Sequence, residues 1–405
     1  MRELEPNKNG QRIKRYSIAM VAACPFPVNY GSPAAIRELS ETLSEMGHDI
    51  HVVTYPHGDN LSVGMARVHR VTRLDTRAGP RVGPSKSKFL LDFLVLLKLC
   101  HVIRKEKTEI IHAHNYEGGL IGVFAKFISR RPLVYNSVNL MSDELPTYGF
   151  IKPRFLANWL AAALDWLVPI FPDHIIAVTQ YLYDWHAKHG VTKKRLTLVG
   201  CGARPAMFDG ADAEKFRAKY AIGSRPVIMY TGVNNAFQRI DYLLRAFTLV
   251  LKSEPSALLM IVSPIDNEPD LPGNFALAKS LGISENVIFA GPHTLEELPH
   301  YLALAAVTVV PRPDCPGHPI KLVNYMMAGK PIVCFTGAAK GVTHMHDAFL
   351  VPDHDWEKMG EAIVTLMRDP QLSEKLGTNA RETALNNFDW QILAKKVEEI
   401  YATVL

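Results

Sequence analysis

The feature that most constrains the fold of this chain is a regular alternation of short apolar runs with amphipathic helical segments. Apolar runs predict buried strands at residues 17–23, 49–54, 109–113, 133–136 and 174–178. Helical spacing of apolar side chains separates these strands at residues 34–46, 89–105, 120–128 and 154–168. Repeated strand–helix–strand units of this kind build a parallel sheet that is covered by helices on both faces.

The same alternation begins again after a stretch that contains Gly and Pro, residues 200–210. Strand signals recur at residues 227–232, 258–262, 287–290, 307–310 and 332–335. We therefore predict an α/β fold of two doubly wound, Rossmann-like domains with a cleft between them, in which ligands lie at the carboxyl ends of the strands. The expected boundaries are an N-terminal domain of residues 1–203, a C-terminal domain of residues 204–385 and a final helical segment, residues 386–405.

Composition excludes several classes of protein. The 405 residues, 48% of them hydrophobic, are enough for two core-bearing domains. The five cysteines show no CxxC spacing, which argues against a disulfide framework or a zinc ribbon and for reduced thiols in the cytosol. The first fifteen residues lack the apolar core of a signal peptide, and no apolar run reaches the roughly 20 residues of a membrane span. We therefore expect a cytoplasmic protein.

The two halves of the chain differ in charge. Residues 1–205 contain 27 Lys and Arg against 17 Asp and Glu, a net of +10, whereas residues 206–405 contain 18 and 23, a net of −5. Seven basic residues and one acid lie between residues 67 and 88, directly before the apolar helix predicted at 89–105. This arrangement fits contact with an anionic membrane surface, and it fits equally a solvated loop before a core helix. No nucleic-acid partner is expected, because no binding motif is present and no aromatic residues interleave the basic run.

A second informative stretch is residues 311–335, PRPDCPGHPIKLVNYMMAGKPIVCF. Four prolines follow a predicted strand and exclude regular structure, after which helical spacing starts near Lys321 and ends at Gly329 and Pro331. A loop at the carboxyl end of a strand thus leads into a helix start that carries a lysine. Free backbone N–H groups, the positive end of the helix dipole and an ammonium together favour a bound anion, above all a phosphate. The alternative is an ordinary helix start with a lysine that faces solvent.

This stretch resembles a known family. The pattern G-x-P-x-K-L-x-x-Y-M-x-A-G-K-P, residues 317–331, is similar to the donor-site signature of the retaining glycosyltransferases of family 4, which have the two-domain GT-B architecture. The similarity extends over residues 16–405 and includes the loop at Gly31 and the segment IHAHN, residues 111–115. It implies an acceptor-side first domain, a nucleotide-sugar-binding second domain and a last helix that returns to the first domain. It also implies a nucleotide-diphosphate sugar as donor substrate, with no cofactor and no required metal.

The resemblance also implies roles for individual residues. Gln238 stands where the family more often has a lysine, and Pro316 and Asn324 stand where it has two glutamates. Asn324 can still hydrogen-bond ribose hydroxyls. Because Lys321 alone offers little charge against a diphosphate, we expect Arg312 to act as a second cation, although an ordinary surface arginine explains it equally. The predicted donor-binding set is Gly31, Gly232, Gln238, Arg312, Gly317, His318, Lys321 and Asn324.

Two histidines lie at the end of the strand predicted at residues 109–113. We expect His112 and His114 to point to opposite faces of this strand, and no cluster of cysteines or carboxylates accompanies them, so no metal site is predicted. The resemblance places His114 near the reacting sugar, which makes His114 and Lys321 the predicted catalytic residues. We interpret His112 as structural.

The sequence therefore predicts a retaining, hexosyltransferase-type enzyme of polysaccharide or glycolipid biosynthesis. It would move a sugar from a nucleotide-diphosphate sugar to a glycan or lipid-linked acceptor in the cytoplasm, with the inner membrane surface as a candidate peripheral site. Two alternatives stay open. One is a nucleotide-sugar epimerase or hydrolase of the same fold, with groups placed for proton transfer at the sugar. The other is a catalytically silent nucleotide-sugar-binding subunit, suggested by the neutral residues at several motif positions.

Overall fold

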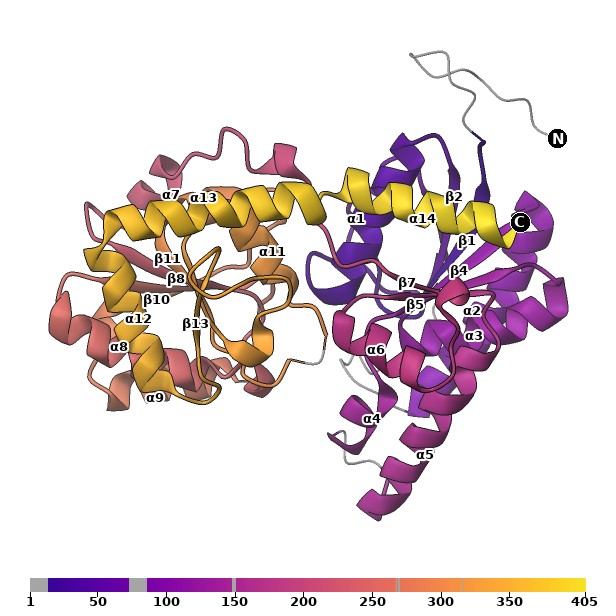
Figure 1. The fold of residues 1–405 in the computed structure, drawn as a ribbon, viewed down its shortest axis with the longest axis horizontal. Coiled ribbons are helices and arrows are strands. Elements are labelled where there is room, and N and C mark those ends of the chain that lie inside the picture. Colours follow the sequence, from indigo (N-terminus) through magenta and orange to yellow (C-terminus); the bar gives the residue numbers. More distant parts are fainter. Residues whose placement is uncertain (1–13, 73–85, 148–150, 267, 269, 316) are drawn as a thin grey trace. The chain divides into compact units, whose positions relative to one another are not determined.

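The chain forms two compact units, each built around a parallel sheet. In the computed structural model the described residues are 14–72, 86–147, 151–266, 268, 270–315 and 317–405. One unit consists of Met1–Gly200 together with Leu393–Leu405, and the other of Cys201–Ile392. Both sheets are parallel throughout and carry flanking helices, so the prediction of two doubly wound, Rossmann-like domains is confirmed (Figure 1).

Among the described residues, seven strands form the sheet of the first unit in the order β3-β2-β1-β4-β5-β6-β7. Because β2 adds to one side of β1 and β4 to the other, the strand order reverses between β1 and β4. Such a reversal opens a crevice at the carboxyl ends of the two strands, where ligands of α/β proteins usually bind. The strands are β1 (Ser17–Ala22), β2 (Asp49–Thr54), β3 (Arg67–Arg70), β4 (Ile110–His114), β5 (Leu133–Ser137), β6 (His174–Ala177) and β7 (Leu196–Leu198).

Helices cover both faces of this sheet. On one face α2 and α3 pack together and enclose a core that includes Val21, Leu99 and Ile111. On the other face α1 contacts β1, where the Ser40 hydroxyl lies 3.2 Å from the Met20 sulfur. The helices are α1 (Gly31–Glu45), α2 (Lys86–Glu106), α3 (Asn115–Ser129), α4 (Met141–Glu144), α5 (Arg154–Leu167) and α6 (Gln180–Lys188), and the 3-10 turn η2 (Val168–Ile170) follows α5.

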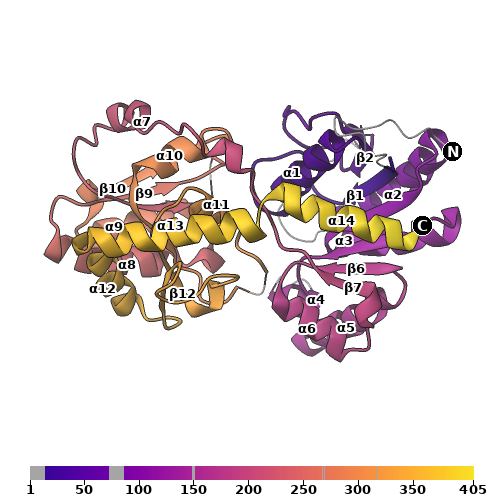
Figure 2. The same cartoon turned by 45° about the horizontal axis from the view of Figure 1, so that its top comes forward.

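Helix α14 (Trp390–Val404) begins in the second unit, and its residues from Leu393 onward belong to the first. Its apolar stripe, which includes Leu393, Val397 and Tyr401, is buried. The Tyr401 hydroxyl lies 2.7 Å from Nδ1 of His112 on β4. The helix is therefore joined to the first unit by apolar packing and by a buried hydrogen bond. Figure 2 shows the course of α14 along this unit.

In the second unit, six strands of the described chain form a sheet in the order β10-β9-β8-β11-β12-β13. The strand order here reverses between β8 and β11, so the expected ligand crevice lies at the carboxyl ends of these two strands. The strands are β8 (Val227–Thr231), β9 (Leu258–Val262), β10 (Val287–Ala290), β11 (Ala305–Val310), β12 (Ile332–Phe335) and β13 (Phe349–Val351).

Alternate residues of β8 enter two separate cores. Val227 and Met229 pack with α10 and α11 on one face of the sheet, whereas Ile228 and Tyr230 pack with α8 and α12 on the other. This alternation is the reason that the strands read as continuous apolar runs. The helices are α7 (Glu214–Lys219), α8 (Ile240–Ser253), α9 (Leu271–Ser280), α10 (Leu298–Leu304), α11 (Ile320–Met327), α12 (Trp356–Arg368) and α13 (Pro370–Asn387).

The basic stretch between residues 67 and 88 is described in part, since Arg73, Arg77 and Arg81 lie outside the described residues. Arg67–Arg70 form the edge strand β3, where a loop was expected; this expectation was wrong because the strand has little apolar character. Arg67 pairs with Asp49 and Glu106, so its charge serves the fold. None of the helices in the described part of the chain has the length and apolar content needed to cross a bilayer.

Candidate functional site

The predicted donor residues of the second unit gather at the strand reversal. One loop follows β8, starts at Gly232 and contains the 3-10 turn η5 (Ala236–Gln238). A second loop follows β11 and leads through Pro319 into α11. Because β8 and β11 are neighbours in the sheet, both loops lie at the same edge. No described side chain caps the first turn of α11, although the N–H of Leu322 donates to the carbonyl of Pro319 at 2.8 Å.

Lys321 is the centre of this group. Its Nζ donates to the hydroxyl of Tyr230 at 2.6 Å and to Oε1 of Gln238 at 2.9 Å. The same ammonium lies 3.9 Å from the centre of the Tyr230 ring. Burial, and next the nearby Arg312, lower the pKa of Lys321 well below its ordinary value. The described hydrogen bonds of the lysine go to neutral oxygens, and the nearby Glu268 raises its pKa less than burial and Arg312 lower it.

Gly232 makes the close packing around Lys321 possible. Its φ of +127° is a conformation that other residues rarely adopt, and a Cβ placed there would lie 2.9 Å from Nζ of Lys321. The Tyr230 hydroxyl donates in turn to the carbonyl of Val233 at 3.0 Å, within the same loop. The structure thus brings Gly232, Gln238 and Lys321 into direct contact around Tyr230.

Arg312 lies beside this group, two residues beyond the end of β11. Its Nε donates to the carbonyl of Asp314 at 2.9 Å, and its guanidinium lies 4.6 Å from the centre of the Phe237 ring. These contacts hold the guanidinium close enough to Lys321 to lower the lysine pKa. The two cations therefore lie near each other at this end of the sheet, and a bound anion would relieve their mutual repulsion.

The remaining predicted donor residues lie on the loop and helix that carry Lys321. Gly317 accepts from the thiol of Cys315 at 3.4 Å through its carbonyl, and Asn324 lies in the middle of α11 with 9% of its surface exposed. Burial lowers the pKa of His318 to about 4, and its Nδ1 is buried without a hydrogen-bond partner among the described residues. Pro316 lies outside the described residues.

Sequence reasoning missed two residues that shape this crevice. The Tyr325 hydroxyl accepts from the backbone N–H of Thr231 at 2.7 Å, which fastens α11 to the end of β8. Glu268 is buried and accepts from the backbone N–H of Asn234 at 2.6 Å and from its side-chain amide. Tyr325 stands in the matched motif, so that signal was available. For Glu268 no spacing pattern links it to Asn234 across 34 positions.

In the first unit the predicted residues Gly31 and His114 also lie at the strand reversal. Gly31 has φ +61° and begins α1, and the neighbouring Ser32 hydroxyl accepts from the Asn115 side-chain amide at 3.2 Å. Nδ1 of His114 lies 3.2 Å from the amide nitrogen of Asn136. Burial lowers the pKa of His114 to about 3, and its Nε2 is buried without a described partner. A neutral imidazole with one uncommitted nitrogen therefore ends β4.

The expectation that His112 and His114 point to opposite faces was wrong. Their ring centres lie only 4.2 Å apart, because residues two apart on a strand share a face. Nδ1 of His112 pairs with Tyr401, whereas its Nε2 is buried without a described partner. Among the described residues no group of three or more His, Cys, Asp or Glu side chains is placed to hold a metal ion.

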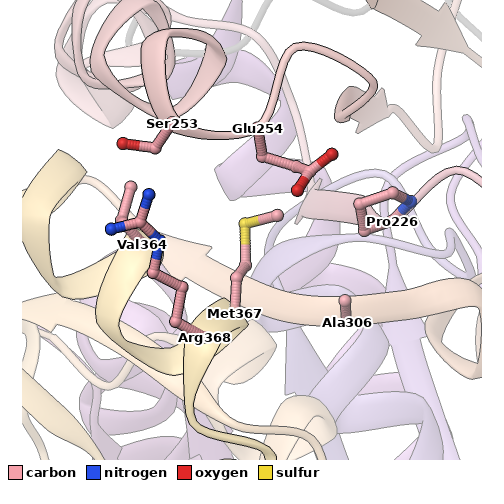
Figure 3. A pocket seen from close by; sticks show the side chains of 7 residues that line it. All are labelled: Pro226, Ser253, Glu254, Ala306, Val364, Met367 and Arg368. Atoms are coloured by element: carbon pink, nitrogen blue, oxygen red, sulfur yellow. The ribbon is translucent and has the colours of Figure 1, made fainter.

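The second unit also has a cavity at the other end of its sheet from Lys321. Its lining includes Glu254, Met367 and Arg368, whose side chains converge in Figure 3. Pro226 and Ala306, which also line it, mark the amino ends of β8 and β11. The cavity therefore opens at the edge of the sheet opposite the predicted donor residues, and we assign it no part in their chemistry.

Comparison with known proteins gives matches to both units. Residues 31–206 match the family described as Glycosyltransferase Family 4, and residues 212–383 match the family described as Glycosyl transferases group 1. The D-inositol 3-phosphate glycosyltransferase of Kribbella flavida is 24% identical over 430 aligned positions, with 98% of each chain covered. The capsular polysaccharide biosynthesis glycosyltransferase CapM of Staphylococcus aureus is 24% identical over 78% of this chain and 82% of its own.

Solved structures share the fold over nearly the whole chain. Sucrose-phosphate synthase of Thermosynechococcus elongatus superposes with a TM-score of 0.80 at 20% identity, covering 96% of this chain and 99% of that one. HepE of Anabaena, solved in complex with UDP and glucose, superposes with a TM-score of 0.78 at 18% identity, covering 96% of this chain and all of its own.

Proposed function

This chain belongs to the family 4 glycosyltransferases, which have the GT-B fold, and from this premise we propose that it is a retaining hexosyltransferase. Its donor would be a nucleotide-diphosphate sugar, and its acceptor a glycan or a lipid-linked sugar. The observation that carries the donor assignment is the pair of cations, Lys321 and Arg312, at the strand reversal of the second unit. Lys321 donates to the neutral oxygens of Tyr230 and Gln238, so the site has a place for an external anion.

In this proposal the second unit stabilises the leaving group. When the bond between the sugar and the diphosphate breaks, negative charge develops on the departing phosphate oxygens. Lys321, Arg312 and the start of α11 lie at the same end of the sheet, so little rearrangement is needed to stabilise that charge. Asn324 and the loop from Gly232 to Gln238 would hold the nucleoside. The cations take the role that a metal has in other transferases, and we propose no cofactor.

The first unit would present the acceptor and the face of the sugar that reacts. His114 is neutral in the physiological range because its burial lowers its pKa to about 3, so we propose that it donates or accepts a hydrogen bond and does not act as a cation. Retention follows from attack on the same face as the departing phosphate, which can itself accept the acceptor proton. No further base is then needed.

The acceptor class is supported by the names of the relatives. One of them acts on D-inositol 3-phosphate, and another takes part in capsular polysaccharide biosynthesis. Both names point to acceptors that carry hydroxyls on a sugar or cyclitol, which suits a glycan or lipid-linked acceptor here. We propose a cytoplasmic location for this reaction.

The proposal is tested with a panel of nucleotide sugars and acceptors, followed by NMR of the products. A glycoside whose anomeric configuration equals that of the donor supports retaining transfer, and an inverted product contradicts it. Release of free sugar as the sole product, or a change of configuration within the nucleotide sugar, would favour the hydrolase or epimerase alternative. Tight nucleotide binding without any turnover across the panel would favour a silent binding subunit.

A further inference from the structure

Helix α5 presents its large apolar side chains to solvent. Phe155, Trp159 and Trp166 are 71%, 67% and 60% exposed. The face that packs on the protein consists of two small residues and one acid, Ala157, Ala161 and Asp165. Amphipathic helices of soluble domains ordinarily bury their apolar face. The large apolar side of α5 therefore lacks a partner in the described part of the chain.

The neighbouring helices extend this exposed apolar surface. On α2, Phe89, Phe93 and Leu97 recur every four residues and are all exposed. At the end of α3, Phe124 and Phe127 are exposed as well. Most of the exposed large apolar side chains among the described residues lie on α2, α3, α5 and η2. We call the exposed large apolar side chains of these four elements the outer apolar surface.

Contacts within the first unit join these elements into one surface. Helices α2 and α3 pack directly against each other. The Phe127 ring of α3 lies 5.5 Å from that of Phe171, in an edge-to-face arrangement. Phe171 follows η2, and η2 follows α5 without a break. Figure 1 shows α5 at the outer end of this group, away from the sheet.

The acids of these helices all have polar partners within the first unit. The Asp165 carboxylate is buried and accepts from the backbone N–H groups of Met141 and Ser142 at 2.7 and 2.8 Å. Asp92 of α2 accepts from the hydroxyl of the buried Tyr55 at 2.5 Å. Glu106 pairs with Arg67, and Glu117 lies 3.7 Å from Lys88. The charge that faces outward from these helices is therefore mainly positive.

Exposed cations lie at the ends of the same helices. Lys152 and Arg154 stand at the start of α5, Arg104 and Lys105 lie in the last turn of α2, and Arg130 caps α3. Aromatic side chains bordered by Lys and Arg match the interface of a bilayer, where rings lie at headgroup depth and cations meet anionic lipids. A second copy of this chain would instead bring the same cations together.

We propose that the outer apolar surface docks on an anionic phospholipid bilayer, with Phe155, Trp159 and Trp166 entering the headgroup region. This docking is separate from the donor chemistry, because it uses none of the residues of the donor crevice. It would hold the first unit at the membrane face, where lipid-linked acceptors reside.

The test is flotation of the full chain with phosphatidylcholine vesicles that contain or lack phosphatidylglycerol, together with tryptophan emission. We expect binding to the anionic vesicles that weakens with salt, and a blue shift as Trp159 and Trp166 leave water. The variant F155S/W159S/W166S should lower vesicle affinity by at least about tenfold. The matched control F275S/M345S/L385S removes exposed apolar side chains of the second unit and should bind vesicles like the wild type.

Thermal unfolding and nucleoside-diphosphate binding, measured on the same variants, should not change. The proposal is overturned if the wild type ignores anionic vesicles at low salt, or if the triple variant binds them equally well. It is also overturned if sedimentation shows a dimer that the triple variant abolishes without any lipid binding, because a second copy would then cover the surface. A wild type that binds vesicles but no nucleoside diphosphate would support the docking and count against the proposed donor site alone.

Discussion

Replacement of Lys321 by methionine separates the charge of this residue from its packing. Methionine keeps an unbranched side chain of similar volume, so the apolar contacts of the stem are retained. In the protein without ligand, Nζ meets neutral oxygens of Tyr230 and Gln238, while burial and Arg312 hold the lysine pKa well below its ordinary value. The ammonium therefore contributes little to the stability of the unliganded fold, and we expect the unfolding midpoint of K321M to stay equal or rise.

Nucleotide affinity should move in the opposite direction. A hydrogen bond to a charged group contributes about 1.5–3 kcal/mol, which corresponds to a factor of about 10 to 150 in the dissociation constant. We expect K321M to weaken nucleoside-diphosphate binding by that factor in calorimetry. The control is K330M, since Lys330 is likewise half-buried but its Nζ donates to the carbonyl of Ala303 at 3.0 Å. It should lower stability and leave nucleotide affinity unchanged.

The lowered pKa of Lys321 adds a pH signature. A bound diphosphate favours the protonated amine, so the lysine pKa is higher in the complex than in the free protein, and binding takes up a proton. Affinity should therefore fall as the pH rises above the lysine pKa of the free protein. Calorimetry in buffers of different ionisation enthalpy measures this uptake, which K321M should abolish. Unchanged affinity and unchanged proton uptake in a folded K321M would refute the assignment of Lys321.

Three further predictions concern the same chain. Gly232→Ala should lower the free energy of unfolding by about 1–3 kcal/mol and displace Lys321, which weakens nucleotide binding. The added Cβ of Gly210→Ala would meet open space, so this variant should lower stability only. Equal nucleotide affinities in the two variants would contradict the prediction. His114→Ala should keep nucleoside-diphosphate affinity within about twofold and lower turnover by about a hundredfold or more, so wild-type turnover in the variant would remove His114 from the reaction. Burial lowers the pKa values of His114 and His318 to about 3 and about 4. As the pH falls below about 6.5 the unfolded state therefore binds protons before the folded state does, and the free energy of unfolding should decrease. A constant unfolding midpoint between neutral and acid pH would show that these groups do not couple to folding.

The sequence predicted the two sheets well because both faces of each are buried. Strand β9 is apolar at every position and β8 at every position before Thr231, and that signal survives without any knowledge of the partners. The edge strand β3 was missed because its side chains are half-exposed and polar. The pattern of apolar residues reports burial, so it is weakest where a strand lies at the edge of a sheet.

Tertiary partners were harder to predict than strands. The orientation of His112 and His114 was available from the sequence, because the two-residue period of a strand places both on one face. Glu268 was missed because its importance comes from a loop that is distant in the sequence. For α5 the pattern indicates two different faces, but the sequence alone does not say that Ala157 and Ala161 would face inward and Trp159 outward.

The return of α14 to the first unit affects the order in which the two units can be completed during synthesis. Translation makes Met1–Gly200 first, yet this unit lacks Leu393–Leu405 until all of Cys201–Ile392 has left the ribosome. Until then the ring of His112 lacks its Tyr401 partner, and the surface that the apolar stripe of α14 covers is open to water. The unit that is made first is therefore the last to be completed, and the nascent chain must keep that surface available while the second unit folds.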